Sequence, residues 1–472
     1  MQKLWSEVCV IGGGPAGSAA AIRLAQCGHS VCLVEQAEFP RAHVGESLSP
    51  GVWPVLESLG VREEVAIGAR FPSGTLLRWS GSETFRRNDQ WPSGGLVDRG
   101  EFDVALLSHA RSWGVQVIQP ARASARRLPD GWEVHAIGAE VTQVSCAWLV
   151  DGSGRLGCME RRRSRFSPST LALWLRLRET ASGNARIEAR PDGWLWAAPI
   201  GDGVTSLLYC CDPSAWKQRE TRGTESALRE VLTNSDLFKS FSRYPAIEPV
   251  RVMDASCSYA LSSIGPGYVK VGEASFAIDP LSSCGIEKAL QSAVVGAIAA
   301  HTLLKHPGRS GLCRRMMQKR VEEAVAQHAE WSGSYYGEVG IHADRPFWAS
   351  RSRNLLRSPP IRPLRADLPK RETRVCLSLT ARWTEEPCIT GNEISSRAAV
   401  HTESLPRPVA YVEGVEIAPL LQALPSEIEV GALVSRWTGE LSSFKAGRIA
   451  AWLWYHRIIH EVHFPAGAEV HP

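Results

Sequence analysis

The sequence lacks three features, and each absence narrows the class of protein. No C-x-x-C pair occurs among the 12 cysteines, which argues against a zinc site or a disulfide framework and favours reduced thiols. The formal net charge is only +4, so nucleic acid is not expected as the main partner. No apolar run approaches the length of a membrane span, and no export signal precedes the first expected strand. We therefore expect a cytoplasmic protein without a metal site.

The N-terminal part of the chain carries a nucleotide-binding pattern. An apolar run at 8–11 leads into the turn GGGPAG, a helix-forming stretch follows at 18–26, and a second apolar strand ends at Glu35. This order of strand, turn, helix, strand and acid is that of a dinucleotide-binding unit. The Glu35 carboxylate is placed to accept hydrogen bonds from a ribose diol.

Each glycine of the turn has a mechanical role in this pattern. Gly12 permits a tight turn, Gly14 lets the backbone approach a pyrophosphate, and Gly17 lets the helix pack against the strand. Pro15 and Ala16 complete the expected cofactor-binding turn at the helix N-terminus, whose positive end holds the anion. The position of this unit at the start of the chain favours FAD over NAD.

Two later segments support a flavin cofactor. The segment LVDGSGR, residues 149–155, is typical of a strand that ends in a turn beside the dinucleotide. The segment 267–293 predicts a strand, an irregular loop and a helix whose positive end can face the flavin pyrimidine edge. The cofactor-binding residues expected here are Asp151, Asp279, Gly285 and Ile286.

The order of five motifs resembles that of a known family. GGGPAG, FPRAHVGESLSP, VDRGEFDVAL, VDGSGR and GEASFAIDPLSSCGI follow one another as in FAD-dependent monooxygenases of the p-hydroxybenzoate hydroxylase-like fold. The resemblance covers about residues 5–345 and is greatest to the branch of the flavin-dependent halogenases. It implies that Arg41 and Arg99 touch FAD and that Ser47 lies near the flavin ring. It also implies that Glu46 helps to hold the loop between cofactor and substrate.

One position departs from the family pattern. The family usually has Gly-Asp where this chain has Gly272 and Glu273. We expect Glu273 to take over the hydrogen bond to the ribityl chain of FAD.

We expect an α/β architecture, with a Rossmann-like FAD-binding domain interleaved with a substrate-side β-sheet and a small, mostly helical C-terminal module. Residues 1–345 form the monooxygenase domain in this interpretation. Its nucleotide-binding parts are expected at about 1–80, 95–160 and 265–345, and its substrate-side sheet at about 80–95 and 165–260.

The C-terminal part is expected to begin with a linker rich in Arg and Pro at 346–373. The module at 374–472 contains segments with helical apolar spacing, for which a winged-helix-like fold is one interpretation. It either docks a protein substrate, or covers the catalytic domain or forms a dimer. His456, His460 and His463 would align on a helix, but a solvated or core-edge face is favoured over a metal site.

The segment GWLWAAPI, residues 193–200, raises the question of a reaction chamber. Strand alternation places Trp194 and Trp196 on one face. A similar Trp-x-Trp-x-x-Pro segment, matched here through Pro199, lies between the flavin and substrate chambers of tryptophan-type halogenases. The alternative is a plain buried strand. Large rigid rings at this place would exclude water from a reactive flavin adduct.

Two groups expected of a halogenase are missing. The family carries a lysine about thirty residues after the GES motif, but no lysine occurs between Gly45 and Gly81. Arg70 is a poor replacement because its guanidinium stays protonated. Many tryptophan halogenases also have a glutamate where this chain has Ser282. These two departures from the halogenase pattern outweigh the shared Trp-x-Trp segment, and we therefore expect an oxygenase.

The implied reaction is hydroxylation of an electron-rich aromatic ring through a flavin C4a-hydroperoxide, whose distal oxygen is electrophilic. A base near the ring then removes the ring proton. The candidates for acid–base work or substrate contact are Glu46, Ser47, Cys284 and His342. Cys284 is also explained as a small residue at a helix start.

The chain resembles the flavoproteins that modify a peptidyl tryptophan during tryptophylquinone biogenesis, of the quinohemoprotein amine dehydrogenase maturation type. This resemblance implies a small tryptophan-containing polypeptide as substrate. Four alternatives stay open: a hydroxylase of a small aromatic metabolite, a halogenase, an isoprenoid-chain reductase of the geranylgeranyl reductase type, and a non-catalytic FAD-bound scaffold.

The electron donor is also open. No second complete Gly-x-Gly-x-x-Gly unit follows a strand, so no separate nicotinamide domain is expected. With O2 as the oxidant, the electrons come either from NAD(P)H or from reduced flavin supplied by a flavin reductase.

Overall fold

The computed structural model describes residues 2–88, 94–159, 162–179, 183–352 and 368–462. The chain divides into two compact units, residues 1–356 and 357–472. The division falls inside the expected linker, of which residues 353–367 lie outside the described part. None of the helices in the described ranges is long and apolar enough to cross a membrane.

The larger unit contains a nucleotide-binding sheet with the order β18-β19-β10-β1-β2-β7, and β8 and β9 extend it beside β10. β1 pairs in parallel with both β10 and β2, and α1 connects β1 to β2. This is the expected Rossmann-like arrangement. Its elements are β1 (Gln2–Ile11), α1 (Pro15–Gln26), β2 (Val31–Val34), β7 (Gln116–Ile118), β8 (Arg122–Leu128), β9 (Gly131–Ile137), β10 (Val141–Asp151), β18 (Ile264–Gly265) and β19 (Tyr268–Lys270).

A second sheet of seven strands has the order β16-β12-β15-β14-β13-β4-β5. All its pairs are antiparallel except β13 with β4. The sheet takes in β4, a few residues before the boundary expected near 80. Its strands are β4 (Gly74–Arg78), β5 (Glu83–Arg87), β12 (Leu171–Arg178), β13 (Ala185–Arg190), β14 (Gly193–Gly201), β15 (Val204–Cys211) and β16 (Arg251–Asp254).

The two faces of the seven-stranded sheet are covered by different elements. Odd-numbered residues of β12 and β14, such as Leu175 and Leu195, pack against α5 (Pro213–Arg219) and α6 (Thr224–Thr233). Even-numbered residues, such as Trp174 and Trp194, pack against the end of α8 (Ser310–Gly337) and against α9 (Pro346–Ala349). Strand alternation therefore separates two cores within one sheet.

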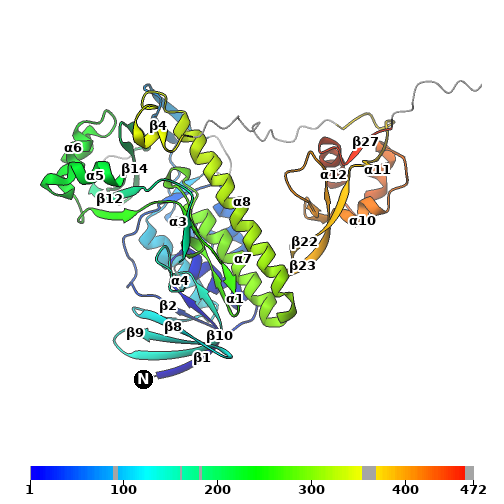
Figure 1. Cartoon of the computed structure of the whole chain (residues 1–472), viewed down its shortest axis with the longest axis horizontal. Helices are drawn as coiled ribbons and strands as arrows, with labels where there is room; N and C mark the ends of the chain where they lie inside the picture. The colour runs from blue at the N-terminus through cyan, green and yellow to red at the C-terminus, as the bar shows by residue number, and fades with distance from the viewer. Residues whose placement is uncertain (1, 89–93, 160–161, 180–182, 353–367, 463–472) are drawn as a thin grey trace, which may run out of the picture. The chain divides into compact units, whose positions relative to one another are not determined.

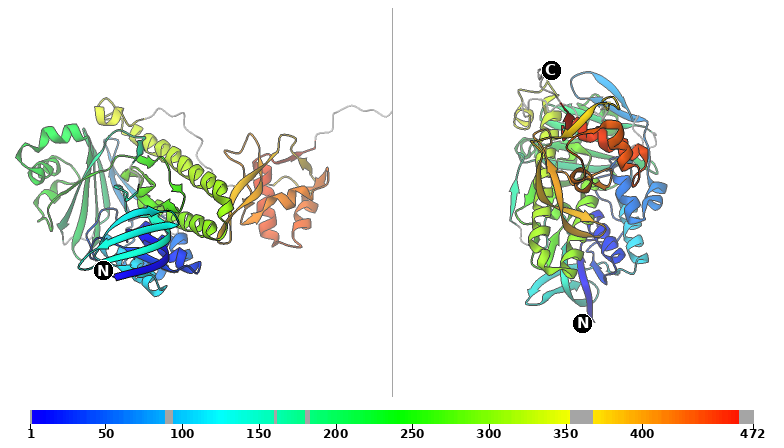
Figure 2. Two further views of the ribbon diagram at one scale, coloured as in Figure 1. Left: turned by 60° about the horizontal axis from the view of Figure 1, so that its bottom comes forward. Right: turned by 90° about the vertical axis from the view of Figure 1, so that its right-hand side faces the viewer.

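Two long helices cross the larger unit. α7 (Gly285–Lys305) and α8 (Ser310–Gly337) run side by side (Figures 1 and 2). α7 also packs against α1, β10 and β19, so it covers the nucleotide-binding sheet. The smaller elements are β3 (Ser47–Leu48), α2 (Val52–Leu59), α3 (Arg62–Gly68), β6 (Gly95–Leu96), α4 (Arg99–Ser112), β11 (Arg163–Arg165), β17 (Ser258–Ala260) and β20 (Phe276–Ala277).

The smaller unit has its own core, but it is not the mostly helical module that was expected. Besides three helices, its described residues contain a hairpin of two nine-residue strands, the two-stranded pair β24-β25 and a three-stranded sheet of order β26-β21-β27. The hairpin residues do not have helical spacing, and they pair in one register along their whole length. The elements are β21 (Arg374–Leu377), β22 (Arg382–Thr390), β23 (Glu393–His401), β24 (Tyr411–Val412), β25 (Val415–Glu416), α10 (Ile417–Gln422), β26 (Ile428–Glu429), α11 (Val430–Trp437), α12 (Ser443–Tyr455) and β27 (Ile459–Glu461).

The three C-terminal histidines do not share a helix. His456 ends α12, His460 lies in β27, and His463 lies outside the described residues. Within the described ranges, no group of three or more His, Cys, Asp or Glu side chains is arranged to hold a metal ion.

Candidate functional site

The glycine turn forms a close-packed cradle at the carboxyl end of β1. Gly12 has φ +100°, and a Cβ there would lie 2.5 Å from the carbonyl oxygen of Gly152. A Cβ on Gly17 would collide with the carbonyl oxygen of Gly12. Gly14 is different, because a Cβ there would meet only Nη2 of Arg41, at 3.6 Å. The first turn of α1 is therefore open toward Arg41, which suits an anion at the helix N-terminus.

Glu35 follows the end of β2 and lies beside this cradle. Its Oε2 accepts a hydrogen bond from the backbone N–H of Gly13 at 2.5 Å, and its Oε1 accepts one from Ala37 at 2.8 Å. The carboxylate is buried, with 5% of the residue exposed. The structure thus places Glu35 where the ribose prediction needs it, and its contact with a ribose stays a prediction.

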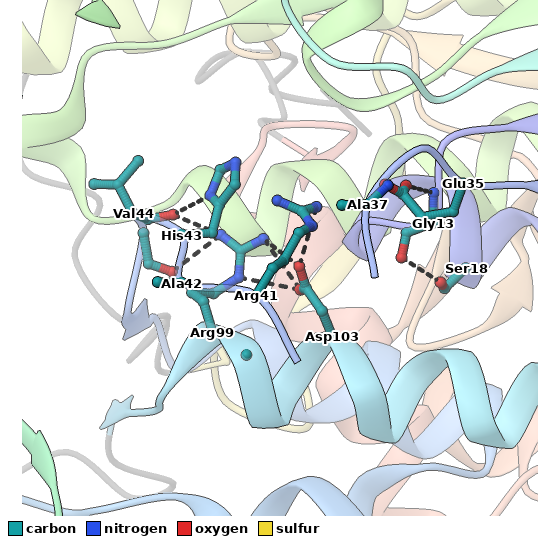
Figure 3. A network of polar contacts seen from close by, with 12 residues as sticks. Gly13, Ser18, Glu35, Ala37, Arg41, Ala42, His43, Val44, Arg99 and Asp103 are labelled. Carbon is teal, nitrogen blue, oxygen red and sulfur yellow. Dashed lines mark hydrogen bonds and ion pairs between the residues drawn. The ribbon is translucent and has the colours of Figure 1, made fainter. Parts of the chain in front are cut away.

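Arg41 and Arg99 point toward the fully buried carboxylate of Asp103 (Figure 3). Arg99 donates to Asp103 from Nε at 3.2 Å and from Nη2 at 3.1 Å, and its Nη1 donates to the carbonyl oxygen of Val44 at 2.7 Å. Burial raises the pKa of Asp103, while Arg99 and Arg41 lower it. Arg99 therefore holds the loop before Glu46.

Arg41 keeps capacity for a further partner. Its Nη2 lies 3.4 Å from Asp103, and its buried Nε has no hydrogen-bond partner among the described residues. Together with its closeness to Gly14, this makes Arg41 the better placed of the two predicted arginines for contact with an anionic cofactor.

Glu46 connects the loop 42–46 to the seven-stranded sheet. Its Oε1 accepts hydrogen bonds from Nε1 of Trp174 at 3.0 Å and from the hydroxyl of Ser206 at 2.6 Å, and Oε2 accepts one from the N–H of Gly45 at 2.8 Å. Burial raises the pKa of Glu46, and these hydrogen bonds oppose the shift. The neighbouring Ser47 lies in β3, which pairs with β6. The geometry supports a positioning role for Glu46.

The turn before α7 is held by Asp279. Its Oδ1 accepts from the N–H of Leu281 at 3.0 Å, and its two oxygens lie 3.1 and 3.0 Å from the hydroxyl of Tyr336. Burial raises the pKa of Asp279. The backbone at Gly285 is open, because a Cβ there would meet nothing within 4 Å, whereas Ile286 is buried. The open backbone at this turn would let a planar aromatic ring system approach the N-terminus of α7.

Three other predicted residues have partners in the chain. Asp151 is fully buried, and its carboxylate accepts from the N–H groups of Ser153 and Cys158. Glu273 forms an ion pair with Arg155 at 3.1 Å and keeps 40% of its side chain exposed. Cys284 donates from Sγ to the carbonyl oxygen of Ser282 at 3.1 Å, and burial raises the pKa of its thiol. Of these, Glu273 is the most accessible to a cofactor.

The tryptophan wall has one buried and one half-buried ring. Trp194 is 2% exposed, and its Nε1 donates to the hydroxyl of Tyr336 at 3.2 Å. Trp196 is half-buried and packs against the same cluster. Pro199 lies further along β14 and lines a pocket with Arg70 and Leu96. Pro199 is therefore separated from the tryptophan wall, because it is an odd number of residues from both rings.

His342 lies in the turn after α8. Its ring centroid is 6.2 Å from that of Trp348, and burial and two nearby arginines lower its pKa.

Sequence reasoning missed Trp174, Ser206 and Tyr336, which form hydrogen bonds with predicted site residues. Their partners are 32 to 160 residues away along the chain, so no local pattern could have found them.

A lysine that could serve as the nucleophile expected of a halogenase is missing from a large part of the chain. The chain has no lysine between Lys3 and Lys217. The buried Lys288 does not fill this role, because its Nζ donates to the carbonyl oxygen of Phe276 and lies 4.7 Å from the centre of that ring. Burial lowers the pKa of Lys288 to about 8.

Comparison with known proteins gives consistent matches. A family model described as tryptophan halogenase matches residues 7–85. A tryptophan 2-halogenase from Chondromyces crocatus is 30% identical over 73% of this chain and 70% of that protein. The structure of QhpG, a peptidyl tryptophan dihydroxylase essential for tryptophylquinone cofactor biogenesis, is 25% identical and covers 95% of this chain and 98% of that chain, with a TM-score of 0.72. The flavin-dependent halogenase CmlS has the same fold, with 22% identity, 98% coverage of both chains and a TM-score of 0.78.

Proposed function

Because the chain belongs to the flavin-dependent halogenase family, we propose that it is an FAD-dependent monooxygenase that hydroxylates a tryptophan side chain of a partner polypeptide. The observation that carries the choice of hydroxylation is the absence of lysine from the sequence between Lys3 and Lys217. The similarity to a peptidyl tryptophan dihydroxylase along 95% of the chain supports a peptidyl substrate.

The residues present fit FAD, the cofactor of this family. The cradle of Gly12 and Gly17 leaves the α1 N-terminus open, and the buried Nε of Arg41 is an unpaired donor within the described residues. These groups would hold the pyrophosphate, Glu35 would hold a ribose, and Glu273 would face the ribityl chain. When bound and reduced, FAD supplies the activation of O2.

The protein's own residues would then position the substrate ring and exclude water. Trp194 and Trp196 form a rigid apolar wall. Arg99 and Glu46 fix the loop between the two sheets through hydrogen bonds to Val44, Trp174 and Ser206. The hydrophobic surroundings also favour an uncharged ring over a charged substrate.

Halogenation is the second candidate, because the chain is similar to a tryptophan 2-halogenase and to a 1H-pyrrole-2-carbonyl-[peptidyl-carrier protein] chlorinase. It would require another group to take the place of the missing lysine. Hydroxylation of a small aromatic metabolite is the third possibility and needs the same cofactor residues.

The test is accurate mass spectrometry after reaction of the purified FAD-loaded protein. A flavin reductase with NADH supplies the electrons, ¹⁸O₂ is the oxidant, and bromide is present. The substrates are a small polypeptide with one tryptophan, its tryptophan-to-phenylalanine counterpart, and free tryptophan. Addition of one or two ¹⁸O atoms to the tryptophan polypeptide alone supports the proposal.

The matched control is Gly14→Glu. Gly14 has φ −71° and ψ −176°, a conformation open to any residue, so the fold tolerates the change. The new carboxylate would lie where the pyrophosphate binds, and FAD binding should be lost. Bromine on the product would establish halogenation instead, and oxygen on free tryptophan alone would establish a small-molecule hydroxylase.

A further inference from the structure

Three buried polar groups link the tryptophan wall to the turn before α7. Nε1 of Trp194 in β14 lies 3.2 Å from the hydroxyl of Tyr336 in α8. The same hydroxyl lies 3.0 Å from Oδ2 of Asp279, whose Oδ1 caps the turn through Leu281. The three side chains belong to three separate elements, and all are buried.

The direction of these hydrogen bonds is fixed by chemistry. An indole N–H is a donor only, so the oxygen of Tyr336 must accept from Trp194. The single hydroxyl proton of Tyr336 is then free to be donated to the carboxylate of Asp279. The chain of bonds therefore runs in one direction, from the wall to the carboxylate, and Tyr336 is the only described group that joins both ends.

The ring of Tyr336 is itself held in place. It makes edge-to-face contacts with Phe347 and Trp348, with centroid distances of 5.8 and 5.7 Å. Because the ring cannot turn without disturbing these contacts, its hydroxyl stays between the wall and the turn. A phenylalanine at this position would keep the ring and remove only the hydroxyl.

We propose that Tyr336 is a positioning residue that fixes the distance between the Trp194 wall and the Asp279 turn, so that water is kept from the flavin side of the chamber. The role assigned to Tyr336 in keeping water from the flavin rests on the proposed flavin-dependent function. The hydrogen bonds that join Trp194, Tyr336 and Asp279 do not depend on that function.

The experiment compares Tyr336→Phe with Tyr335→Phe. Tyr335 precedes Tyr336 in α8 and is 42% exposed, so its variant controls for a lost hydroxyl on the same helix. Hydrogen–deuterium exchange is measured on the FAD-free and FAD-loaded proteins. The FAD-loaded proteins are then reduced anaerobically and mixed with O2, and the rate of hydrogen peroxide release is recorded without any aromatic substrate. In this reaction reduced FAD loses two electrons and two protons, and O2 gains them.

In Tyr336→Phe we expect faster exchange in both 193–201 and 279–285, unchanged FAD affinity, and hydrogen peroxide release about tenfold faster. Trp194→Phe should have a similar effect, and the double variant should be no faster than either single one, because both remove the same link. Tyr335→Phe should match the unmodified protein.

Equal peroxide release from Tyr336→Phe and the unmodified protein would overturn the proposal, as would additive effects in the double variant. Faster exchange in only one of the two segments would also overturn it. A protein that binds FAD and shows the expected exchange and peroxide release, yet modifies no tryptophan, would retain this inference and reject the proposed substrate.

Discussion

The two faces of the seven-stranded sheet come from alternate residues of the same strands, yet their buried polar groups have different partners. The face toward α5 and α6 buries mainly leucine and aromatic side chains, and its buried carboxylate, Glu188, accepts from Ser235 and Leu237. The opposite face adjoins buried carboxylates, indole N–H groups and hydroxyls, joined by hydrogen bonds from Glu46 and Asp279. Polar groups cost free energy to bury even when they are paired. The hydrogen-bonded groups around Glu46 and Asp279 therefore give up part of the stability available to an apolar core, as expected where a site must be held in one geometry.

The largest effect on stability is expected on the apolar face. Phe238 is fully buried there, so Phe238→Ala should lower the free energy of unfolding by about 3–5 kcal/mol. Turnover per folded, FAD-loaded protein should stay unchanged, because the chamber face keeps all its contacts. Urea unfolding and turnover at a temperature well below the transition measure the two quantities. A proportional loss of turnover would show that the faces are not independent.

Glu46→Ala tests the chamber face. It leaves the hydroxyl of Ser206 without its acceptor, while the N–H of Trp174 keeps only the oxygen of Ser206, and it should cost about 1–3 kcal/mol of stability. We also expect loss of most turnover, because the loop 42–46 loses its link to Trp174 and Ser206 of the sheet.

The matched control for Glu46→Ala is Glu188→Ala. Glu188 is a buried carboxylate of β13 that accepts from the hydroxyl of Ser235 and the N–H of Leu237. Its loss should cost similar stability but leave turnover of the folded protein intact. Equal losses of turnover in the two variants would remove the distinction between the faces.

Acid should lower the free energy of unfolding through His328, a buried histidine of α8. Burial lowers the pKa of His328 to about 4, and its Nδ1 has no partner among the described residues. Because the unfolded chain binds this proton first, the contribution of His328 is present above pH 6.5 and is lost as pH falls toward 4, by about 1.4 kcal/mol per pH unit.

His328→Phe should therefore remove about that slope from the unfolding free energy between pH 6 and 4. The raised pKa values of Glu46 and Asp279 act in the opposite direction, since those groups bind protons more readily in the folded state. For this reason the difference between variant and unmodified protein is the measured quantity. An unchanged slope in His328→Phe would show that this imidazole is already charged in the folded protein.

The smallest effect on stability is expected from exchanging tryptophans for phenylalanines. Trp196→Phe on the chamber face and Trp216→Phe on the apolar face should each change the free energy of unfolding by less than about 1.5 kcal/mol. Only Trp196→Phe should change the ratio of hydroxylated product to hydrogen peroxide, which mass spectrometry and a peroxide assay report. A similar change in Trp216→Phe would mean that the wall has no special role.

The sequence predicted the nucleotide-binding half well, since its strand, turn and helix are contiguous in the chain. It also predicted that Trp194 and Trp196 share a face. It was less informative at Asp151 and Arg99, because a carboxylate or guanidinium near a cofactor motif can equally well hold the protein's own turns. The C-terminal hairpin was missed because two helical segments were taken to represent the whole module.

The sequence by itself determined the α/β architecture, the glycine cradle, the alternation of the sheet and the absence of lysine between Lys3 and Lys217. Each depends on residue type or on the spacing of near neighbours. Only the tertiary structure decided that Glu46 meets Trp174 across 128 residues and that Trp194 meets Tyr336 across 142. Such pairs form because the packing of separate elements brings their ends within 3.2 Å, and no periodicity in the chain encodes that approach.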